Sequence, residues 1–204
     1  SYVDVSDVFY AGEEEIHIST ALQLQQEAYE CTVGYCNNIY IIDNDIDMTD
    51  VEFNGFGATG YPFTGYIDGQ GHTISNLSME VIEDTSDDVY AGFVNYSNNA
   101  IIKNIVLDNA SLITKNVFSS EHTVKTGLLI GFSYNDFVHD VMIMNSTIDG
   151  YSNGRLHIGG AIGATMFSKI DNMFVDVNIV ANSQDQTKVG GLIGFSENIS
   201  IPFN

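Results

Sequence analysis

The sequence predicts an all-β fold, a parallel β-solenoid preceded by one short helix. Three observations carry this prediction: a glycine-rich hexamer recurs at intervals of 36, 32 and 31 residues, a second short motif keeps its order relative to the hexamer, and helical spacing of apolar residues is absent after residue 31. A repeat of about 30 residues built only from strands has the length of one solenoid coil, in which equivalent strands stack about 4.8 Å apart.

The first landmark of the repeat is a hexamer that combines glycines with apolar residues. Its four copies are Tyr90–Asn95 (YAGFVN), Thr126–Gly131 (TGLLIG), Ile158–Gly163 (IGGAIG) and Val189–Gly194 (VGGLIG). The doubled glycine suits a place where two backbones approach closely or where the chain turns with positive φ. We therefore expect the hexamers to stack as one column of corners.

The second landmark is an apolar-x-Asn/Asp-apolar run inside a strand rich in β-branched residues. It occurs at Ile74–Leu77, Ile102–Ile105, Val138–Val141 and Ile170–Met173. Stacking of these runs would form a polar ladder whose side chains satisfy backbone groups of the turns, made of Asn76, Asn104, Asp140 and Asn172. An antiparallel β-sandwich or a set of propeller blades is the alternative architecture, and the lack of Asn-Gly hairpin signals counts against it.

One amphipathic helix is predicted near the N-terminus. The segment Thr20–Gln23 fits a capping box, which marks the start of a helix. Its apolar face, in a helix that runs through Glu30, carries Ala21, Leu24 and Ala28. A solenoid exposes the apolar end of its first coil, and a helix laid across that end would cover it.

The composition limits the classes of partner. The chain of 204 residues carries six Lys and Arg against 27 Asp and Glu, a formal net charge of −21. Such a surface repels nucleic acid and anionic membranes. No stretch approaches the roughly 18 apolar residues of a membrane helix, and the chain begins at Ser1 without a cationic signal segment. We expect a mature extracellular chain that forms a single domain, with residues 1–38 as an N-terminal cap and residues 39–204 as the coils.

Cysteine usage is a further indication of compartment. The two cysteines, Cys31 and Cys36, lie in one short segment, so they either form a local disulfide or stay reduced, and a zinc site lacks the two further ligands it needs. The five Asn-x-Ser/Thr sequons, which include Asn109 and Asn145, permit glycosylation of a secreted surface.

Two segments follow the predicted helix and precede the hexamers. They are Ile39–Met48 (IYIIDNDIDM) and Phe63–Leu77 (FTGYIDGQGHTISNL). Together with the hexamers they resemble the GLUG-motif β-helix region of bacterial and archaeal surface proteins, such as immunoglobulin A1 peptidases and large adhesins, over roughly residues 16–204. The resemblance implies a right-handed parallel β-helix that serves as a non-catalytic extracellular module. Two hexamers depart from the pattern, because Tyr90–Asn95 lacks the final glycine and Thr126–Gly131 lacks the second.

An acidic run supplies the one metal hypothesis. Asp43, Asp45 and Asp47 alternate, so in an extended chain they project from one side and offer oxygen ligands to calcium. The alternative is a solvated, negatively charged edge, and the run lacks the glycine and glutamate positions of an EF-hand loop.

A polysaccharide-active enzyme is the catalytic alternative, because β-helices host pectinases and lyases. Gly71-His72-Thr73 only begins the Gly-His-Gly of a pectinase-like site, and Arg155 is the sole arginine. We expect His72 to make a structural hydrogen bond to backbone, and His17, His122, His139 and His157 to have surface or turn roles. No Gly-x-Ser-x-Gly elbow is present. The sequence therefore predicts no catalytic residues.

A structural or adhesive surface module that self-associates or belongs to a larger extracellular assembly is the function we expect. A carbohydrate-binding module is the other alternative, with stacking faces offered by Tyr61, Tyr66, Tyr90, Tyr96, Tyr134 and Tyr151. The apolar residues Ile199, Ile201 and Phe203 begin a further coil, and we expect a neighbouring subunit or more polypeptide to cover this edge.

Overall fold

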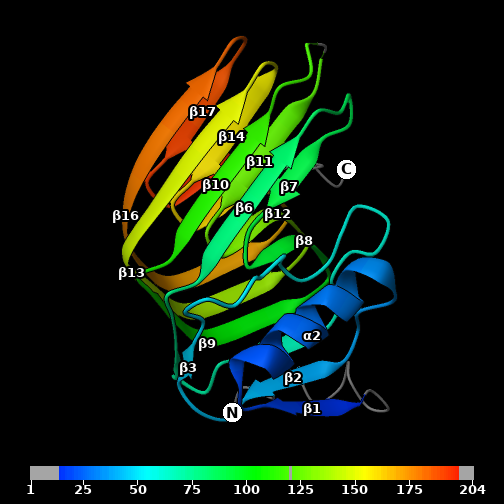
Figure 1. Cartoon of the computed structure of the whole chain (residues 1–204), viewed down its shortest axis with the longest axis vertical. Coiled ribbons are helices and arrows are strands. Elements are labelled where there is room, and N and C mark those ends of the chain that lie inside the picture. The colour runs from blue at the N-terminus through cyan, green and yellow to red at the C-terminus, as the bar shows by residue number, and fades with distance from the viewer. Residues whose placement is uncertain (1–13, 120, 198–204) are drawn as a thin grey trace, which may run out of the picture.

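The computed structural model describes residues 14–119 and 121–197 as a parallel β-solenoid. Every ladder between its strands runs parallel. In Figure 1 the chain climbs from β1 and β2 at one end to β16 and β17 at the other, so each coil lies on the one before it. The solenoid and the short helix near its N-terminus confirm the predicted fold class.

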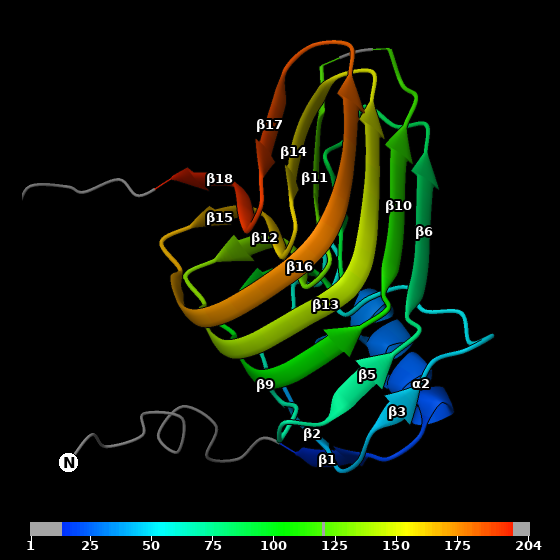
Figure 2. The same ribbon diagram turned by 90° about the vertical axis from the view of Figure 1, so that its left-hand side faces the viewer.

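The longest sheet contains ten of the described strands and curves around one side of the molecule (Figure 2). Its strands are β1 (Glu15–Ile18), β2 (Ile39–Ile42), β3 (Ile46–Asp47), β4 (Tyr66–Asp68), β5 (Thr73–Ser75), β6 (Ser78–Glu83), β9 (Ile101–Asp108), β10 (Ser111–Asn116), β13 (Phe137–Ser152) and β16 (Lys169–Ser183). The later strands are longer because β13 pairs with β9 along its first half and with β10 along its second half. We call this sheet the long sheet.

Two four-stranded sheets close each coil. The first side sheet is β7 (Val89–Ala91), β11 (Thr123–Gly127), β14 (Arg155–Gly159) and β17 (Thr187–Gly190), and the second side sheet is β8 (Val94–Asn98), β12 (Ile130–Tyr134), β15 (Ile162–Met166) and β18 (Ile193–Glu197). The glycine hexamers form the corners between the two side sheets, as the sequence predicted.

The core is a set of apolar columns inside the coils. Side chains alternate in burial along the strands, as in β10, so every second residue faces inward. Ile67, Ile102 and Val138 share one register column and are at most 1% exposed. Near the N-terminal end, aromatic rings fill the wider interior, and the rings of Phe53 and Phe93 stack with centroids 5.3 Å apart.

Helix α2 (Ala21–Val33) covers the N-terminal end. The predicted capping box is present, because Gln23 donates its backbone N–H to the Thr20 hydroxyl and accepts the backbone N–H of Thr20 on its side-chain oxygen. Leu24, Ala28 and Cys31 are buried in the core. The helix therefore closes the first coil, and β1, which lies inside the segment predicted to be the cap, already pairs with β2.

In three columns of corners, the chain turns at residues whose backbone has the left-handed conformation. Their non-glycine members with positive φ are Asn76, Asn109 and Asn145 in one column, Asn104, Asp140 and Asn172 in a second, and Asn99, Asn135 and Phe167 in a third. Asparagine and aspartate tolerate this conformation better than other side chains, since their short polar groups bond locally. The repeated asparagines in the sequence thus mark turns.

The predicted ladder is right for three of its members and wrong for Asn76. Asn104, Asp140 and Asn172 stack in register, but Asn76 aligns with Asn109 in the neighbouring column. The strand that stacks on Ile102 is β4, through Ile67, and not the strand around Ile74. The error has a physical reason: the coil of β9 has two corners of the same apolar-x-Asn-apolar form, Ile102–Ile105 and Leu107–Ala110, and the spacing between repeats does not distinguish them.

The first hexamer is also displaced by one residue. Ala91 pairs with Thr126, whereas Val94 pairs with Ile130, so this corner has one residue fewer than the later corners. Tyr90 accordingly pairs with Lys125 and lies in the strand before the corner. The shorter corner occurs in the hexamer that lacks the final glycine.

Candidate functional site

The C-terminal end of the solenoid is open. Among the described strands, β16 pairs only with β13, β17 only with β14 and β18 only with β15, so all three sheets present a free edge on the same end. Free strand edges offer unpaired N–H and C=O groups to another chain segment. This end, built from β16, β17 and β18 and drawn in orange and red in Figure 2, is the candidate interface and is called the open face below.

The interior of the last coil is only partly covered. Its inward-facing apolar residues pack on the core but remain partly exposed, and they are Ile170, Met173, Val175, Val177, Ile179, Ala181, Leu192 and Ile193. One coil earlier, Val138, Ile143 and Ile162 occupy equivalent positions and are 0% exposed. The chemistry of the two coils is the same, so the difference arises because a coil lies over one of them and none of the described residues lies over the other.

Amide side chains link successive coils at the corners. In one column Asn76 donates its amide to Asp47 over 2.8 Å, and Asn109 donates to Asn76 over 2.7 Å. In the neighbouring column Asn104 donates to Asp68, and Asn172 donates to Asp140. Asn172, followed by His139, lowers the pKa of Asp140, because both hydrogen bonds favour the charged carboxylate. The ladders thus hold coils together and do not form a binding site.

The three aspartates of the calcium hypothesis do not converge. Asp43 accepts a hydrogen bond from His17, Asp45 accepts the backbone N–H of Thr73, and Asp47 accepts from Asn76. Hydrogen bonding lowers the pKa of Asp45 and of Asp47, and it raises the pKa of His17. Among the described residues no group of three or more His, Cys, Asp or Glu is placed to hold a metal ion, so the three-carboxylate site lacks structural support.

Aromatic side chains gather where the two side sheets meet, on the outer surface. The ring of Tyr90 lies 5.4 Å from Tyr96 and 5.7 Å from Phe132, measured between centroids. The Lys125 ammonium lies 4.9 Å from the Tyr90 centroid and 2.5 Å from an Asp88 oxygen. These rings pack against one another and under a lysine, so they do not offer a free platform for a sugar. Of the other candidate tyrosines, Tyr134 lies in β12 two residues from Phe132, whereas Tyr61 lies on the N-terminal loop, Tyr66 in β4 and Tyr151 in β13.

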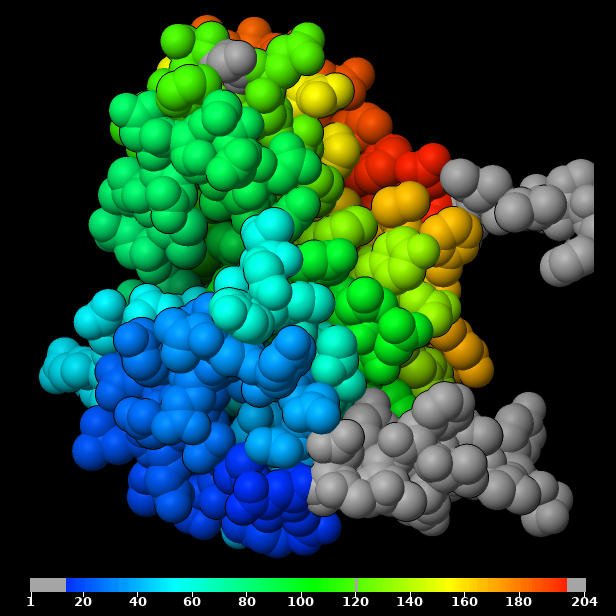
Figure 3. Space-filling view, turned by 90° about the vertical axis from the view of Figure 1, so that its right-hand side faces the viewer, coloured from blue at the N-terminus to red at the C-terminus, as the bar shows by residue number. Residues whose placement is uncertain are grey.

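A cavity of about 540 Å³ lies where the N-terminal loop 54–59 meets β6 and the segment 85–90 (Figure 3). Four carboxylates line it, from Glu80, Glu83, Asp87 and Asp88, and no basic residue does. A lyase acting on an acidic polysaccharide needs a basic group and a cation at its site. This cavity therefore repels the uronate substrates of the pectinases and lyases that share the β-helix architecture.

Asp136 is a buried carboxylate that no sequence pattern singled out. It accepts hydrogen bonds from the Ser97 and Ser133 hydroxyls, both at 2.6 Å, and from the backbone N–H of Ala100 at 2.8 Å. It is 3% exposed, and burial raises its pKa to about 6 against the opposing effect of these bonds. Ala100 and Ser168 occupy its position in the adjacent coils, so no repeat pattern marks it.

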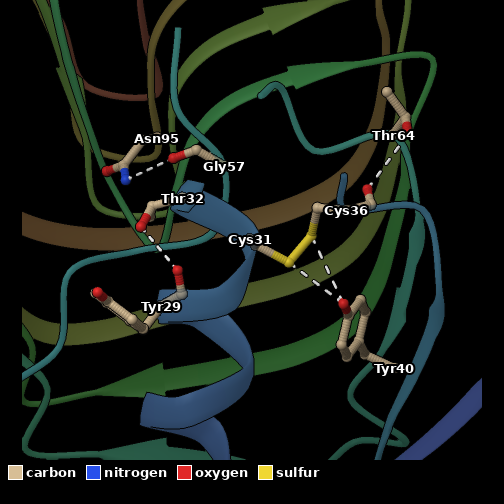
Figure 4. The surroundings of a disulfide bond; sticks show 8 residues. All are labelled: Tyr29, Cys31, Thr32, Cys36, Tyr40, Gly57, Thr64 and Asn95. Atoms are coloured by element: carbon tan, nitrogen blue, oxygen red, sulfur yellow. Dashed lines mark hydrogen bonds between the residues drawn. A yellow bond between two sulfur atoms is a disulfide. The ribbon is translucent and has the colours of Figure 1, made fainter. Parts of the chain in front are cut away.

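A disulfide joins Cys31 to Cys36 and ties the end of α2 to the chain that enters β2 (Figure 4). Both residues are 1% exposed, and the Tyr40 hydroxyl contacts the Cys31 sulfur at 3.3 Å. Of the alternatives that the sequence left open, the structure thus selects the disulfide. A disulfide of this kind persists in oxidising compartments.

Two histidines are more buried than the predicted surface roles imply, although His122 lies outside the strands, directly before β11. His122 lies buried and its ring contacts the Ser152 hydroxyl at 2.8 Å. His157 is 7% exposed, its ring packs 4.8 Å from that of Phe195, and burial followed by the charges of nearby lysines lowers its pKa to about 4. His72 contacts the Asp45 carboxylate through its ring and not a backbone group. The ring of His157 is covered because Phe195 belongs to β18 of the following coil, a contact that the sequence pattern does not reveal.

Several sequence predictions have no test in the structure. Asn109 and Asn145 are exposed, as glycosylation requires, although both amides already serve the ladders. Ile199, Ile201 and Phe203 lie outside the described residues. None of the described helices has the length and apolar character needed to cross a bilayer.

Comparison with known proteins gives one similarity of note. No family model matches the chain, and no solved structure matches it. The chain is similar to halomucin of Haloquadratum walsbyi (strain DSM 16790 / HBSQ001), with 30% identity over 146 residues. The aligned region is 66% of this chain and 1% of halomucin, so the chain corresponds to a very small part of that relative.

Proposed function

We propose that this protein is a non-catalytic structural module of an extracellular surface, a segment of a β-solenoid rod with the adhesive or assembly role of such rods. The observation that carries the proposal is the asymmetry of the two ends. Helix α2 closes the N-terminal end, whereas the open face presents free edges and a partly exposed core. A module with one closed and one open end suits a position within a larger array.

Three further observations support the extracellular setting. The Cys31–Cys36 disulfide is typical of oxidising compartments. The net charge of −21 keeps a surface protein soluble and away from nucleic acid. The similar region of halomucin belongs to a protein whose name denotes a mucin, a class of extracellular protein. The glycine corners agree with the GLUG-type resemblance, which remains part of the proposal.

Surface labelling tests this function. Antibodies raised against the 204-residue chain should label intact cells of the source organism as strongly as permeabilised cells. Proteinase K added to intact cells should remove the labelling, whereas a cytoplasmic marker protein stays undigested. Labelling seen only after permeabilisation would refute the extracellular setting. Release of reducing or unsaturated sugars from polysaccharides by the purified chain would refute the non-catalytic role.

A further inference from the structure

The glycines at the corners between the side sheets are required by the coil that follows each of them. A Cβ atom added to Gly92 would lie 2.5 Å from the Gly127 carbonyl oxygen, and one added to Gly127 would lie 2.6 Å from the Ala161 oxygen. A Cβ added to Gly160 would lie 2.2 Å from the Gly191 oxygen. In each case the contact is with main chain of the next coil, which cannot move aside without breaking the stack.

Gly191 is the equivalent of Gly160 in the last coil, since Gly159 pairs with Gly190. Among the described residues, no atom beyond its chain neighbours lies within 4 Å of a Cβ built on Gly191. Its φ is outside the left-handed region that favours glycine. Neither local conformation nor contact within the described chain therefore accounts for a glycine here.

A following coil accounts for Gly191, for the free edges and for the exposed interior together. We propose that the open face binds one further coil of the same kind, supplied by polypeptide that follows Glu197, with a main-chain carbonyl of that coil against Gly191. The inference rests on the proposed function for its setting, but its test measures stacking and not surface location. The proposed stacking and the proposed surface location can therefore fail independently of each other.

A second copy of the chain fits the open face less well. The N-terminal end of such a copy is covered by α2, whose Leu24 and Ala28 are buried, and the free edges of its described strands β1, β6 and β7 belong to different coils. Two open faces related by a twofold axis would bring strands together in antiparallel orientation. The ladders that join the last two described coils are all parallel, so such a contact would not continue the stack.

The test appends a second copy of residues 167–197 directly after Glu197, which adds one coil in the spacing of β15 and β18. In the 204-residue chain, Gly160→Ala should lower the melting temperature by about 5 °C or more, and Gly191→Ala should leave it unchanged. In the extended chain, Gly191→Ala should lower it as much as Gly160→Ala does. The extension itself should raise the melting temperature and reduce the binding of an apolar dye.

Three results would overturn the inference. The first is that Gly191→Ala leaves the melting temperature of the extended chain unchanged, while a protease digests the added coil at the rate of an unfolded peptide. The second is a chain without the extension that forms a dimer in sedimentation and loses it on Gly191→Val, which would make a second copy the occupant. If the extended chain aggregates, a synthetic peptide of residues 167–197 is added to the 204-residue chain in its place. The third result that would overturn the inference is that this peptide does not slow amide hydrogen exchange in β16.

Discussion

At the scale of single residues, the third column of corners contains one residue that does not suit it. Asn99 and Asn135 have φ of 56° and 53°, and Phe167 adopts the same conformation with φ 59°. A left-handed conformation costs an ordinary side chain about 1–2 kcal/mol. Phe167 recovers part of that cost from an edge-on contact with Tyr134, at 5.6 Å between centroids.

Phe167→Asn should therefore stabilise the protein by about 1 kcal/mol. The substitution relieves the backbone and extends the ladder in which Asn135 donates to Asn99, and these gains exceed the lost aromatic contact. Urea unfolding should show a higher midpoint with an unchanged slope. Phe167→Ala serves as the control, because it loses the ring and keeps the strain, so its midpoint should fall. Equal losses for both variants would contradict the prediction.

Asp136 should make the protein less stable as the pH rises from about 4 to about 6. Its carboxyl keeps the proton up to a pKa of about 6 in the folded chain, whereas in the unfolded chain it releases the proton near pH 4. Its contribution to the unfolding free energy is complete below pH 4 and falls by about 3 kcal/mol by pH 7. Asp45, Asp47 and Asp140 act in the opposite direction, because their pKa values are lowered and their contributions are lost only as the pH falls below about 4.

Asp136→Asn isolates this contribution. The amide keeps an acceptor for the serine hydroxyls and does not titrate in this range, so the variant should lack the decline in unfolding free energy between pH 4 and pH 7. The difference in free energy between the wild type and the variant at the two pH values is the quantity to measure. A wild type and a variant with parallel pH profiles would show that the pKa of Asp136 is the same in the folded and the unfolded chain.

At the scale of elements, the repeated motifs and the helix could be predicted from the sequence better than the register between strands of successive coils. The hexamers and the capping box of α2 were recognisable because each repeats or obeys a local rule. The register of Asn76 could not be predicted, because β9 contains two corners of the same form, at Asn104 and Asn109, and only stacking distinguishes them. Asp136 escaped prediction because its partners Ser97 and Ser133 come from two different coils.

The disulfide fixes the connection between α2 and β2. It closes a loop with a sequence separation of 5, for which chain entropy predicts a stabilisation of about 2 kcal/mol. Reduction with dithiothreitol should therefore lower the melting temperature by about 4–8 °C. The double variant with Cys31→Ala and Cys36→Ala should melt near the temperature of the reduced wild type and should not respond to dithiothreitol. A wild type unaffected by complete reduction would show that core packing alone fixes α2.

At the scale of the whole molecule, charge and shape act against each other. The chain has 27 acidic residues, and acidic residues occur along the described coils from Glu14 to Glu197. Amide ladders place asparagine against aspartate at several contacts between coils, as Asn145 does with Asp108 at 2.8 Å. Only six Lys and Arg are available to pair with the remaining carboxylates. Ions in the solvent must therefore screen most of the repulsion between these carboxylates.

Stability should therefore rise with salt. Increasing sodium chloride from about 10 mM to about 150 mM shortens the screening length from about 30 Å to about 8 Å, which weakens repulsion between carboxylates on different coils. The melting temperature should rise over this range, and magnesium chloride at matched ionic strength should act in the same way. Calcium at about 1 mM in 150 mM sodium chloride adds little screening, so it should have no further effect unless a specific site exists. A melting temperature that does not change with salt would show that the local ladders, and not ions in the solvent, offset the charge. A melting temperature that rises only with calcium would indicate a specific metal site, which the positions of Asp43, Asp45 and Asp47 do not support.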